Sequence, residues 1–176
     1  MHNLIFFLCF FILLPSILSG RPKFLLITEN GQLITLNSLT KSTNWIFILF
    51  NNYNCVDCVK ELDTCLKRIQ DTNLIKGVIV RCENNVIAKK EILAKIQKNL
   101  IGYSFFFDYH KLKDPWPPCN LKEGIFGYYK ICQSPSILLA NKYSIRFISY
   151  KDLFGKKLSV DSLLRNEIFN FFYRNE

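Results

Sequence analysis

Two cysteines, Cys55 and Cys58, are the residues with the clearest capacity for chemistry. They follow a continuous apolar run, Trp45–Phe50, and stand where apolar residues begin to repeat with helical spacing. Two thiols separated by two residues at the start of a helix lie within disulfide reach. Because a helix N-terminus stabilises an anion, the pKa of the first thiol should fall there. The pattern predicts that Cys55 attacks a disulfide and that Cys58, one turn further on, resolves the mixed disulfide.

Two other interpretations of this pair remain open. One is a zinc site, but structural zinc is usually held by two close pairs of ligands. The remaining candidate ligands are single and widely spread: Cys65, Cys82, Cys119, Cys132 and His110. We therefore expect no metal and no cofactor. The other interpretation is an inert structural disulfide.

A second informative feature is the dipeptide Ser134-Pro135, which directly precedes an apolar run, Ile137–Ala140. A cis peptide bond before proline costs little free energy. With a C-x-x-C motif upstream, we predict that this bond is cis. The backbone of Ser134 would then face outward, where an extended substrate could pair with it as in edge-strand addition. The simpler alternative is a trans proline that merely begins a strand.

These residues together resemble the thioredoxin superfamily, in which a cis-proline loop faces the C-x-x-C pair. The closer resemblance is to the exported TlpA/ResA-like thioredoxins, which overlap with the AhpC/TSA-type proteins, and it covers about residues 24 to 172. The matching stretches are N-G-Q-L-I-T-L-N-S-L, I-F-I-L-F, C-V-D-C-V-K-E-L and S-P-S-I-L-L-A-N-K-Y-S-I-R-F-I-S. The resemblance implies a thiol-disulfide oxidoreductase without a cofactor. It carries over Cys55, Cys58, Glu61 and Pro135.

Glu61 stands three residues after the second cysteine, where family members often have a glutamate. The resemblance implies that it manages the proton of Cys58 during exchange. An ordinary charge on the helix surface is the alternative.

Two departures from the family pattern concern the choice of substrate and the redox poise of the cysteine pair. Asn54 replaces the usual Trp, and Asp57 places a carboxylate between the thiols, where it opposes thiolate formation. We therefore expect a reducing or mildly poised pair.

Two other functions use the same fold. A peroxiredoxin-like peroxide reductase needs Thr or Ser three residues before its reactive cysteine, where this chain has Asn52. It also needs an arginine, and the candidates Arg68, Arg81 and Arg146 have no motif around them. A non-catalytic binding module, in which the cysteines are structural, is the second alternative.

The elements that must position these residues alternate between strands and helices. A hairpin is expected from Phe24 to Leu36. Buried strands are expected at 45–50, 75–80 and 103–107, a late hairpin at 137–150, and helices from Cys55, from Asn84 and over 160–172. Such alternation predicts an α/β fold with a mixed central sheet flanked by helices and an N-terminal β-hairpin extension. The resemblance implies that this fold is thioredoxin-like.

The N-terminus predicts export. Leu4–Leu14 is a run of 11 apolar residues followed by Pro15 and small residues, which is typical of a signal peptide over residues 1–20. An uncleaved membrane anchor is the alternative. Residues 21–176 would then form one thioredoxin-like domain in a periplasmic or other extracytoplasmic compartment. Because disulfides persist there, Cys119 and Cys132, which bracket the loop before Pro135, could form a structural disulfide.

Composition excludes several classes of protein. The chain of 176 residues is 49% hydrophobic, which is too apolar for a disordered protein. Its formal charge is +9, but the basic residues are scattered and do not alternate with aromatics, so we expect no nucleic-acid partner. The expected partners are cysteine-containing exported proteins and an upstream thiol electron donor. Membrane contact is expected only if the N-terminal segment is retained.

Overall fold

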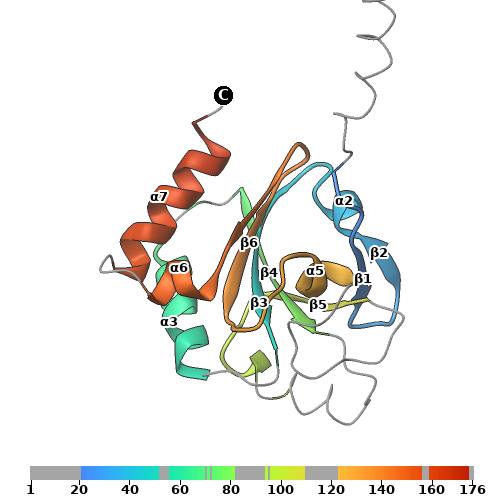
Figure 1. Cartoon of the computed structure of the whole chain (residues 1–176), viewed down its shortest axis with the longest axis horizontal. Helices are drawn as coiled ribbons and strands as arrows, with labels where there is room; N and C mark the ends of the chain where they lie inside the picture. The colour runs from blue at the N-terminus through green and yellow to red at the C-terminus, as the bar shows by residue number, and fades with distance from the viewer. Residues whose placement is uncertain are drawn as a thin grey trace, which may run out of the picture.

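A mixed β-sheet forms the centre of the molecule (Figure 1). The structure is a computed structural model, and it describes residues 21–51, 56–69, 71, 73–81, 94, 96–109, 123–155 and 159–174. Within this part of the chain the sheet has seven strands in the order β2-β1-β5-β4-β3-β6-β7. The predicted signal segment, residues 1–20, lies outside the described residues. Among the described residues, no helix has the length and apolarity that crossing a membrane would require.

Three parallel strands make up the middle of the sheet: β3 (Asn44–Phe50), β4 (Leu74–Arg81) and β5 (Ser104–Asp108). Trp45–Phe50 was predicted as a strand covered on both faces, and all six of its residues are buried. Such a strand can be apolar throughout because helices cover both sides of a parallel sheet. The predicted central strand is confirmed.

Hairpins extend the sheet on both sides. The predicted N-terminal hairpin is present as β1 (Leu25–Thr28) and β2 (Leu33–Thr35), and β1 pairs antiparallel with β5. On the other side, β6 (Ser136–Ala140) pairs antiparallel with β3, and β7 (Ile145–Ile148) pairs with β6. The mixed sheet predicted from the order of elements is therefore confirmed.

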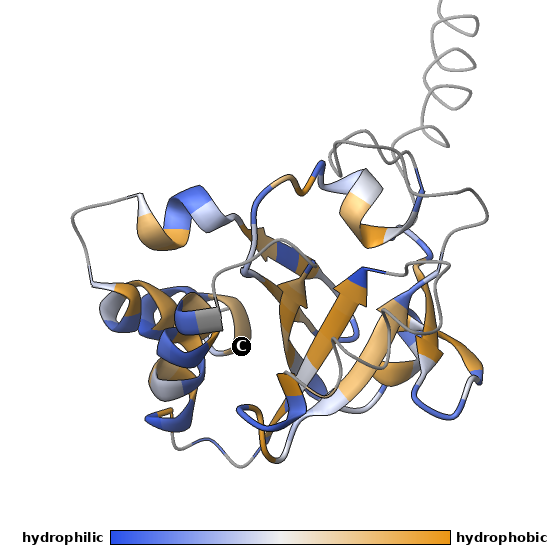
Figure 2. Cartoon of the chain, turned by 90° about the horizontal axis from the view of Figure 1, so that it is seen from below, coloured by the Kyte–Doolittle hydropathy of each residue, from blue (hydrophilic) through white to orange (hydrophobic). Residues whose placement is uncertain are grey.

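Helices cover both faces of the sheet, as Figure 1 shows. One face carries α3 (Val56–Lys67), α6 (Tyr150–Phe154) and α7 (Val160–Phe172). The opposite face carries the short helices α2 (Leu36–Leu39) and α5 (Gly124–Tyr128). Each layer encloses its own cluster of buried apolar side chains, and the hydrophobic strands between them are evident in Figure 2.

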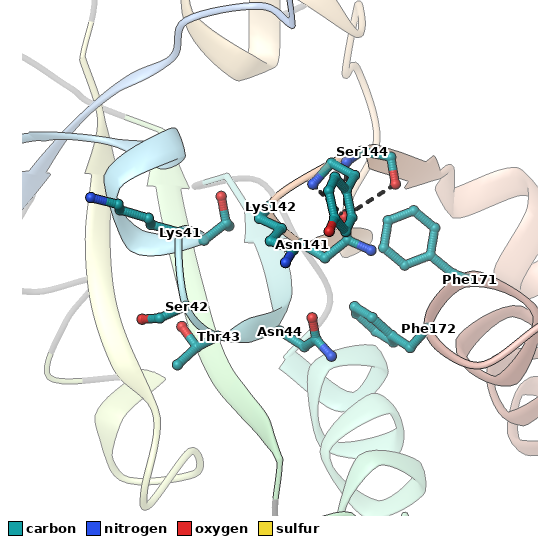
Figure 3. Close-up of a pocket in the computed structure, with 11 residues that line it drawn as sticks. Lys41, Ser42, Thr43, Asn44, Asn141, Lys142, Ser144, Phe171 and Phe172 are labelled. Atoms are coloured by element: carbon teal, nitrogen blue, oxygen red, sulfur yellow. Dashed lines mark hydrogen bonds between the residues drawn. The ribbon is translucent and has the colours of Figure 1, made fainter. Parts of the chain in front are cut away.

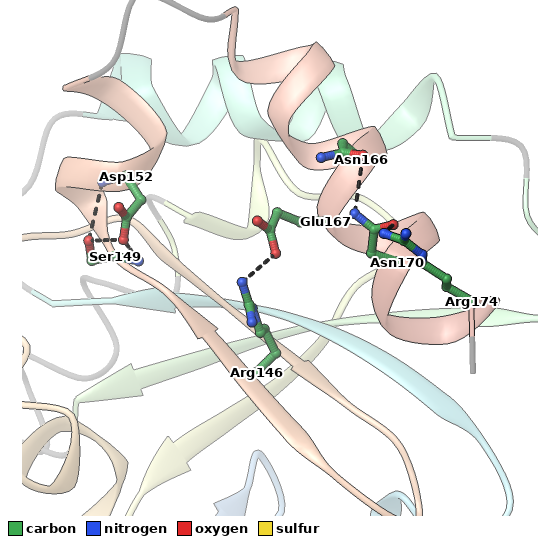
Figure 4. A network of polar contacts seen from close by, with 7 residues as sticks. All are labelled: Arg146, Ser149, Asp152, Asn166, Glu167, Asn170 and Arg174. Atoms are coloured by element: carbon green, nitrogen blue, oxygen red, sulfur yellow. Dashed lines mark hydrogen bonds and ion pairs between the residues drawn. The ribbon is translucent and has the colours of Figure 1, made fainter.

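Three short helices differ from the sequence-based expectation. Tyr150 was expected to end a strand, and Leu153–Lys157 was expected to be a loop. Instead, α6 begins at Tyr150 and continues to Phe154. Ser149 caps this helix in a capping box with Asp152, whose backbone N–H donates to Ser149 Oγ at 3.2 Å (Figure 4). At Leu36, expected to end the hairpin, α2 begins because Thr35 Oγ1 caps it.

The third missed helix is α5. Residues 124–132 were expected only to approach a turn, but Gly124–Tyr128 is helical. The helix predicted from Asn84 lies mostly outside the described residues. Its end is described, where the N–H groups of Asn99 and Leu100 donate to the carbonyl of Ile96. The predicted helix over 160–172 is confirmed as α7. An ion pair between Arg146 and Glu167 (3.1 Å) connects it to β7 (Figure 4).

Gly77 in the middle of β4 is required by aromatic packing. The rings of Trp45 and Phe47 stack 5.0 Å apart, and Phe106 meets both edge-on. A Cβ at Gly77 would lie 2.6 Å from the Phe47 ring, which is fully buried. Because Trp45 and Phe106 confine this ring, it cannot move aside.

We predict that Gly77→Ala lowers the free energy of unfolding by about 1–3 kcal/mol, the usual cost of overpacking. Urea denaturation followed by circular dichroism measures this change. The double variant Gly77→Ala/Phe47→Leu supplies the control, because the smaller side chain makes room for the methyl group. Its loss should be less than the sum of the two single losses. Additive losses would show that the methyl group does not meet Phe47.

Candidate active site

At one edge of the sheet, the end of β3 before the cysteine pair meets the segment that contains Ser134 and Pro135. The parallel strands β3, β4 and β5 all end there, and β6 begins there because it runs antiparallel to β3. Asn51 follows β3 directly, and its backbone N–H donates to Ser134 Oγ at 3.1 Å. This bond connects the segment leading to the cysteine pair with the segment that contains Pro135. Loops at the carboxyl ends of parallel strands are the usual location of a site in an α/β fold.

Cys58, the second residue of the predicted pair, lies in the first turn of α3. The helix begins at Val56, one residue after the predicted start at Cys55, and Cys58 is half-buried within its first turn. Cys55 itself lies outside the described residues. The boundary of α3 therefore agrees with the predicted setting of the pair, and the roles of attacking and resolving thiol remain predictions.

Packing on one face positions α3. Val59, Leu62, Cys65 and Leu66 are buried against the sheet, so the apolar stripe predicted from the sequence faces the core. At the end of the helix, Lys76 Nζ donates to the carbonyl oxygen of Leu66 at 2.8 Å. Burial lowers the pKa of Lys76. A cation at a helix C-terminus complements the helix dipole, so this contact helps to fix the helix that carries Cys58.

Asp57 and Lys60 lie on the solvent face of α3, whereas Asp63 on the same helix is buried. The Asp57 side chain is 86% exposed, and Lys60 Nζ lies 3.4 Å from its Oδ1. Solvent weakens such a pair, so it contributes little to the stability of the helix. Glu61 is also exposed. One turn further on it contributes to raising the pKa of Cys65, and its predicted action on Cys58 remains a prediction.

The peptide bond between Ser134 and Pro135 is cis, as predicted. The Ser134 side chain, however, is directed inward: it is 4% exposed and accepts the N–H of Asn51. On the other side of Pro135, Ser136 Oγ donates to the carbonyl of Gln133 and accepts the N–H of Tyr150. Ser134 and Ser136 therefore hold the segment 131–135, which we call the Pro135 loop, against the sheet.

Two buried charged residues at this edge were not identified as site residues from the sequence. Arg81 ends β4 and is 4% exposed, and Asp108 ends β5 and is fully buried. The two are partners in the β4–β5 register. Arg81 was considered only as a candidate peroxide ligand, and Asp108 was not considered. A charged residue that closes an otherwise apolar strand is the signal that could have identified both, because burial of a charge requires a compensating partner.

The remaining cysteines differ in their exposure. Cys132 is exposed, and its thiol donates to the carbonyl of Lys130 at 3.6 Å. Cys119 and Cys82 lie outside the described residues, so the predicted Cys119–Cys132 disulfide remains a prediction. Cys65 is a buried free thiol whose pKa is raised mainly by burial and further by Asp161 and Glu61. Within the described ranges, no group of three or more His, Cys, Asp or Glu side chains could hold a metal ion.

A pocket of about 320 Å³ lies at the opposite end of β3 (Figure 3). Its lining comes from three places: the turn before β3, the turn between β6 and β7, and the end of α7. Figure 3 shows Asn44, Lys142 and Phe172 among these residues. Asn44 and Asn51 flank opposite ends of the same strand. The pocket therefore contains none of the predicted site residues.

Comparison with known proteins reveals similarity of structure alone. No family model matches the chain, and no curated protein matches it. An uncharacterized thioredoxin-like protein from Porphyromonas gingivalis has a TM-score of 0.58 at 14% identity, covering 88% of this chain and 93% of its own. Copper-bound ScoI from Arabidopsis thaliana has a TM-score of 0.57 at 13% identity, covering 88% and 98%. The thioredoxin domain of a thiol-disulfide oxidoreductase from Bacteroides vulgatus has a TM-score of 0.53 at 15% identity, covering 85% of this chain and 96% of its own.

The fold is thioredoxin-like. The resemblance noted from the sequence is therefore confirmed at the level of architecture, together with the predicted fold class. Because one fold hosts many activities, the function depends on the residues gathered at the edge where β3, β4 and β5 end.

We predict that Cys65 resists alkylation in the folded protein. Burial and the raised pKa both suppress its thiolate, so iodoacetamide should modify it at least about tenfold more slowly than Cys58 in the reduced protein. Mass spectrometry of peptides after timed labelling measures both rates. Labelling in urea is the control, in which the two rates should converge. Equal rates in the native protein would contradict the assignment.

Proposed function

We propose that this protein is an exported thiol-disulfide oxidoreductase that works through Cys55 and Cys58. The observation that supports it best is the hydrogen bond between Asn51 N–H and Ser134 Oγ, which joins the approach to the cysteine pair to the Pro135 loop. A thiol pair at a helix start beside a loop that can receive an extended chain is suited to disulfide exchange with a protein substrate.

The exchange transfers two electrons from the pair to the substrate. The Cys55 thiolate attacks one sulfur of the substrate disulfide, forming a mixed disulfide and releasing the other substrate sulfur as a thiolate that takes up a proton. The Cys58 thiol then loses its proton and attacks the Cys55 sulfur. This step forms the Cys55–Cys58 disulfide and releases the second substrate thiol. An upstream dithiol donor reduces the pair again.

The charges around the pair favour a reducing or mildly poised couple. The N-terminus of α3, a helix of 12 residues, stabilises a thiolate at Cys55. Asp57 opposes this stabilisation, and Lys60, 3.4 Å from the Asp57 carboxylate, offsets part of its charge. Glu61 completes the proposed site as the residue that manages the proton of Cys58.

The proposed partners are exported proteins that carry cysteines, together with the upstream thiol donor. This location rests on the apolar N-terminal run and its small-residue end. In such a compartment we also propose a disulfide between Cys119 and Cys132. Cys132 is exposed three residues before Pro135, so this bond would fix the segment that enters the Pro135 loop.

We predict that the reduced protein catalyses reduction of insulin disulfides and that Cys55→Ser lowers the rate about 100-fold or more, because the attacking thiol is lost. Insulin precipitation with dithiothreitol as donor measures turnover. Cys58→Ser should instead accumulate a mixed disulfide with the substrate, visible on a non-reducing gel. Cys65→Ala is the matched control, since this buried cysteine lies on the same helix and should be dispensable for turnover.

Absence of turnover in the native protein would favour a non-catalytic binding module. Consumption of hydrogen peroxide without insulin reduction would favour the peroxide reductase. Turnover that survives in Cys55→Ser would contradict the assigned role of Cys55.

We also predict opposite shifts in redox equilibrium for the two members of the surface pair. Asp57→Asn removes a charge that destabilises the thiolate, so the reduced form should gain about two- to fivefold in its equilibrium with glutathione. Lys60→Gln should shift the equilibrium the other way. Alkylation of samples equilibrated with mixtures of glutathione and its disulfide measures both. A native pair that glutathione reduces readily, or shifts of the same sign, would contradict the proposed poise.

A further inference from the structure

The buried carboxylate of Asp108 holds the start of α5. Its Oδ1 accepts the backbone N–H of Ile125 at 2.9 Å, and its Oδ2 accepts that of Phe126 at 3.0 Å. The first N–H groups of a helix have no partner within the helix and are normally satisfied by a nearby capping side chain. Glu123, at the capping position, makes no such bond with its side chain. Asp108, from the end of β5, therefore takes over the capping of α5.

Gly124 allows this close contact. Its backbone has a φ of +72°, and a Cβ at this position would overlap the Asp108 carboxylate. Only glycine combines that conformation with the space available. The first residue of α5 therefore lies directly against the carboxylate, and the position of the helix depends on it.

Arg81 neighbours Asp108 on the adjoining strand. It is 4% exposed and is the register partner of Asp108 on the neighbouring strand, so both residues lie on the α5 face of the sheet. An ionised carboxylate accepts with both oxygens and forms stronger bonds with N–H groups than a neutral acid does.

A short, ordered connection leads from α5 to the Pro135 loop. After the end of α5, the N–H of Ile131 donates to the carbonyl of Phe126 at 2.9 Å, and Ile131 is 2% exposed. Phe126 is the residue whose N–H is bound by Asp108. From the other side, Ser134 accepts the N–H of Asn51. Besides its bonds to Asn51 and Ser136, the Pro135 loop is therefore held through α5 on Asp108.

We propose that Asp108, with Arg81 beside it, is a positioning residue for the exchange reaction, because it fixes the loop against which a peptide substrate is laid. This inference rests on the proposed function and assigns the substrate class as an extended polypeptide disulfide. Displacing α5 from Asp108 impairs the binding of a peptide disulfide. A small disulfide that needs no pairing with the Pro135 loop continues to react with the cysteine pair.

The test compares Gly124→Ala with Gly102→Ala in the full chain. Gly102 is the matched control because it also has a positive φ, +85°, but a Cβ there meets nothing within 4 Å. Steady-state rates are measured with a disulfide-linked peptide and with 5,5′-dithiobis(2-nitrobenzoate). Gly124→Ala raises KM for the peptide about tenfold, with kcat and the rate on the small disulfide within about twofold of native. Gly102→Ala leaves both substrates unaffected.

A second variant avoids dependence on the folding of Gly124→Ala. Arg81→Met/Asp108→Leu removes the cap of α5 and replaces both buried charges by apolar side chains of similar size, a kind of change that is often tolerated. It should raise the peptide KM in the same way, after circular dichroism has confirmed that it is folded.

An unchanged peptide KM in a folded variant overturns the inference. Equal losses on both substrates also overturn it, because they indicate damage to the cysteine pair and not to the loop. Native protein without activity on either substrate overturns the proposed function and this inference with it. If the native protein is active and the peptide KM of the variant is unchanged, this inference alone is overturned.

Discussion

The hydrogen bond between the Asn51 N–H and Ser134 Oγ is the contact on which the arrangement of the site depends. It exists because β6 runs antiparallel to β3, so that the start of one strand lies beside the end of the other. Both partners are buried, and a buried N–H without an acceptor would cost about 1–3 kcal/mol. The bond therefore holds the Pro135 loop beside the segment that leads to the cysteines. Its two partners are more than 80 residues apart in the sequence, so only the sheet can bring them together.

The rest of the sheet gives this contact a rigid support. Both faces of β3 are covered, and its aromatic residues are confined by neighbours on β4 and β5. The confinement is close enough to require a glycine opposite Phe47. A strand held in this way cannot slide, because a shift of one residue would exchange its two buried faces. The end of β3, and with it Asn51, is thereby placed where the Pro135 loop can meet it.

Charges at the site edge follow two different rules. Asp57 and Lys60 are exposed, so water screens them and their pairing contributes little to the stability of the helix. Arg81 and Asp108 are buried, where an uncompensated charge would be costly. Two backbone N–H groups that donate to Asp108 supply part of this compensation. The buried carboxylate thus fixes the start of α5.

Local patterns in the sequence were sufficient for the elements with strong periodicity. The apolar run Trp45–Phe50 predicted a strand buried on both faces, the stripe from Cys58 predicted the inward face of α3, and the hairpins followed from their turns. These signals depend on near neighbours, whose spacing determines which side chains share a face. The short helices α5 and α6 were missed because a few residues contain too little periodicity to identify a helix. The cap of α5 in particular comes from a distant strand.

For the candidate site, the sequence alone determined the residue types that can exchange disulfides, their spacing at a helix start, and the proline that accompanies them. Only the tertiary structure decided that Ser134 turns inward to bind Asn51 and that Asp108 holds α5 beside Arg81. The physical reason is that hydrogen bonds and buried charges act over a few ångströms in space. Sheet topology, and not position along the chain, determines which groups come within that distance.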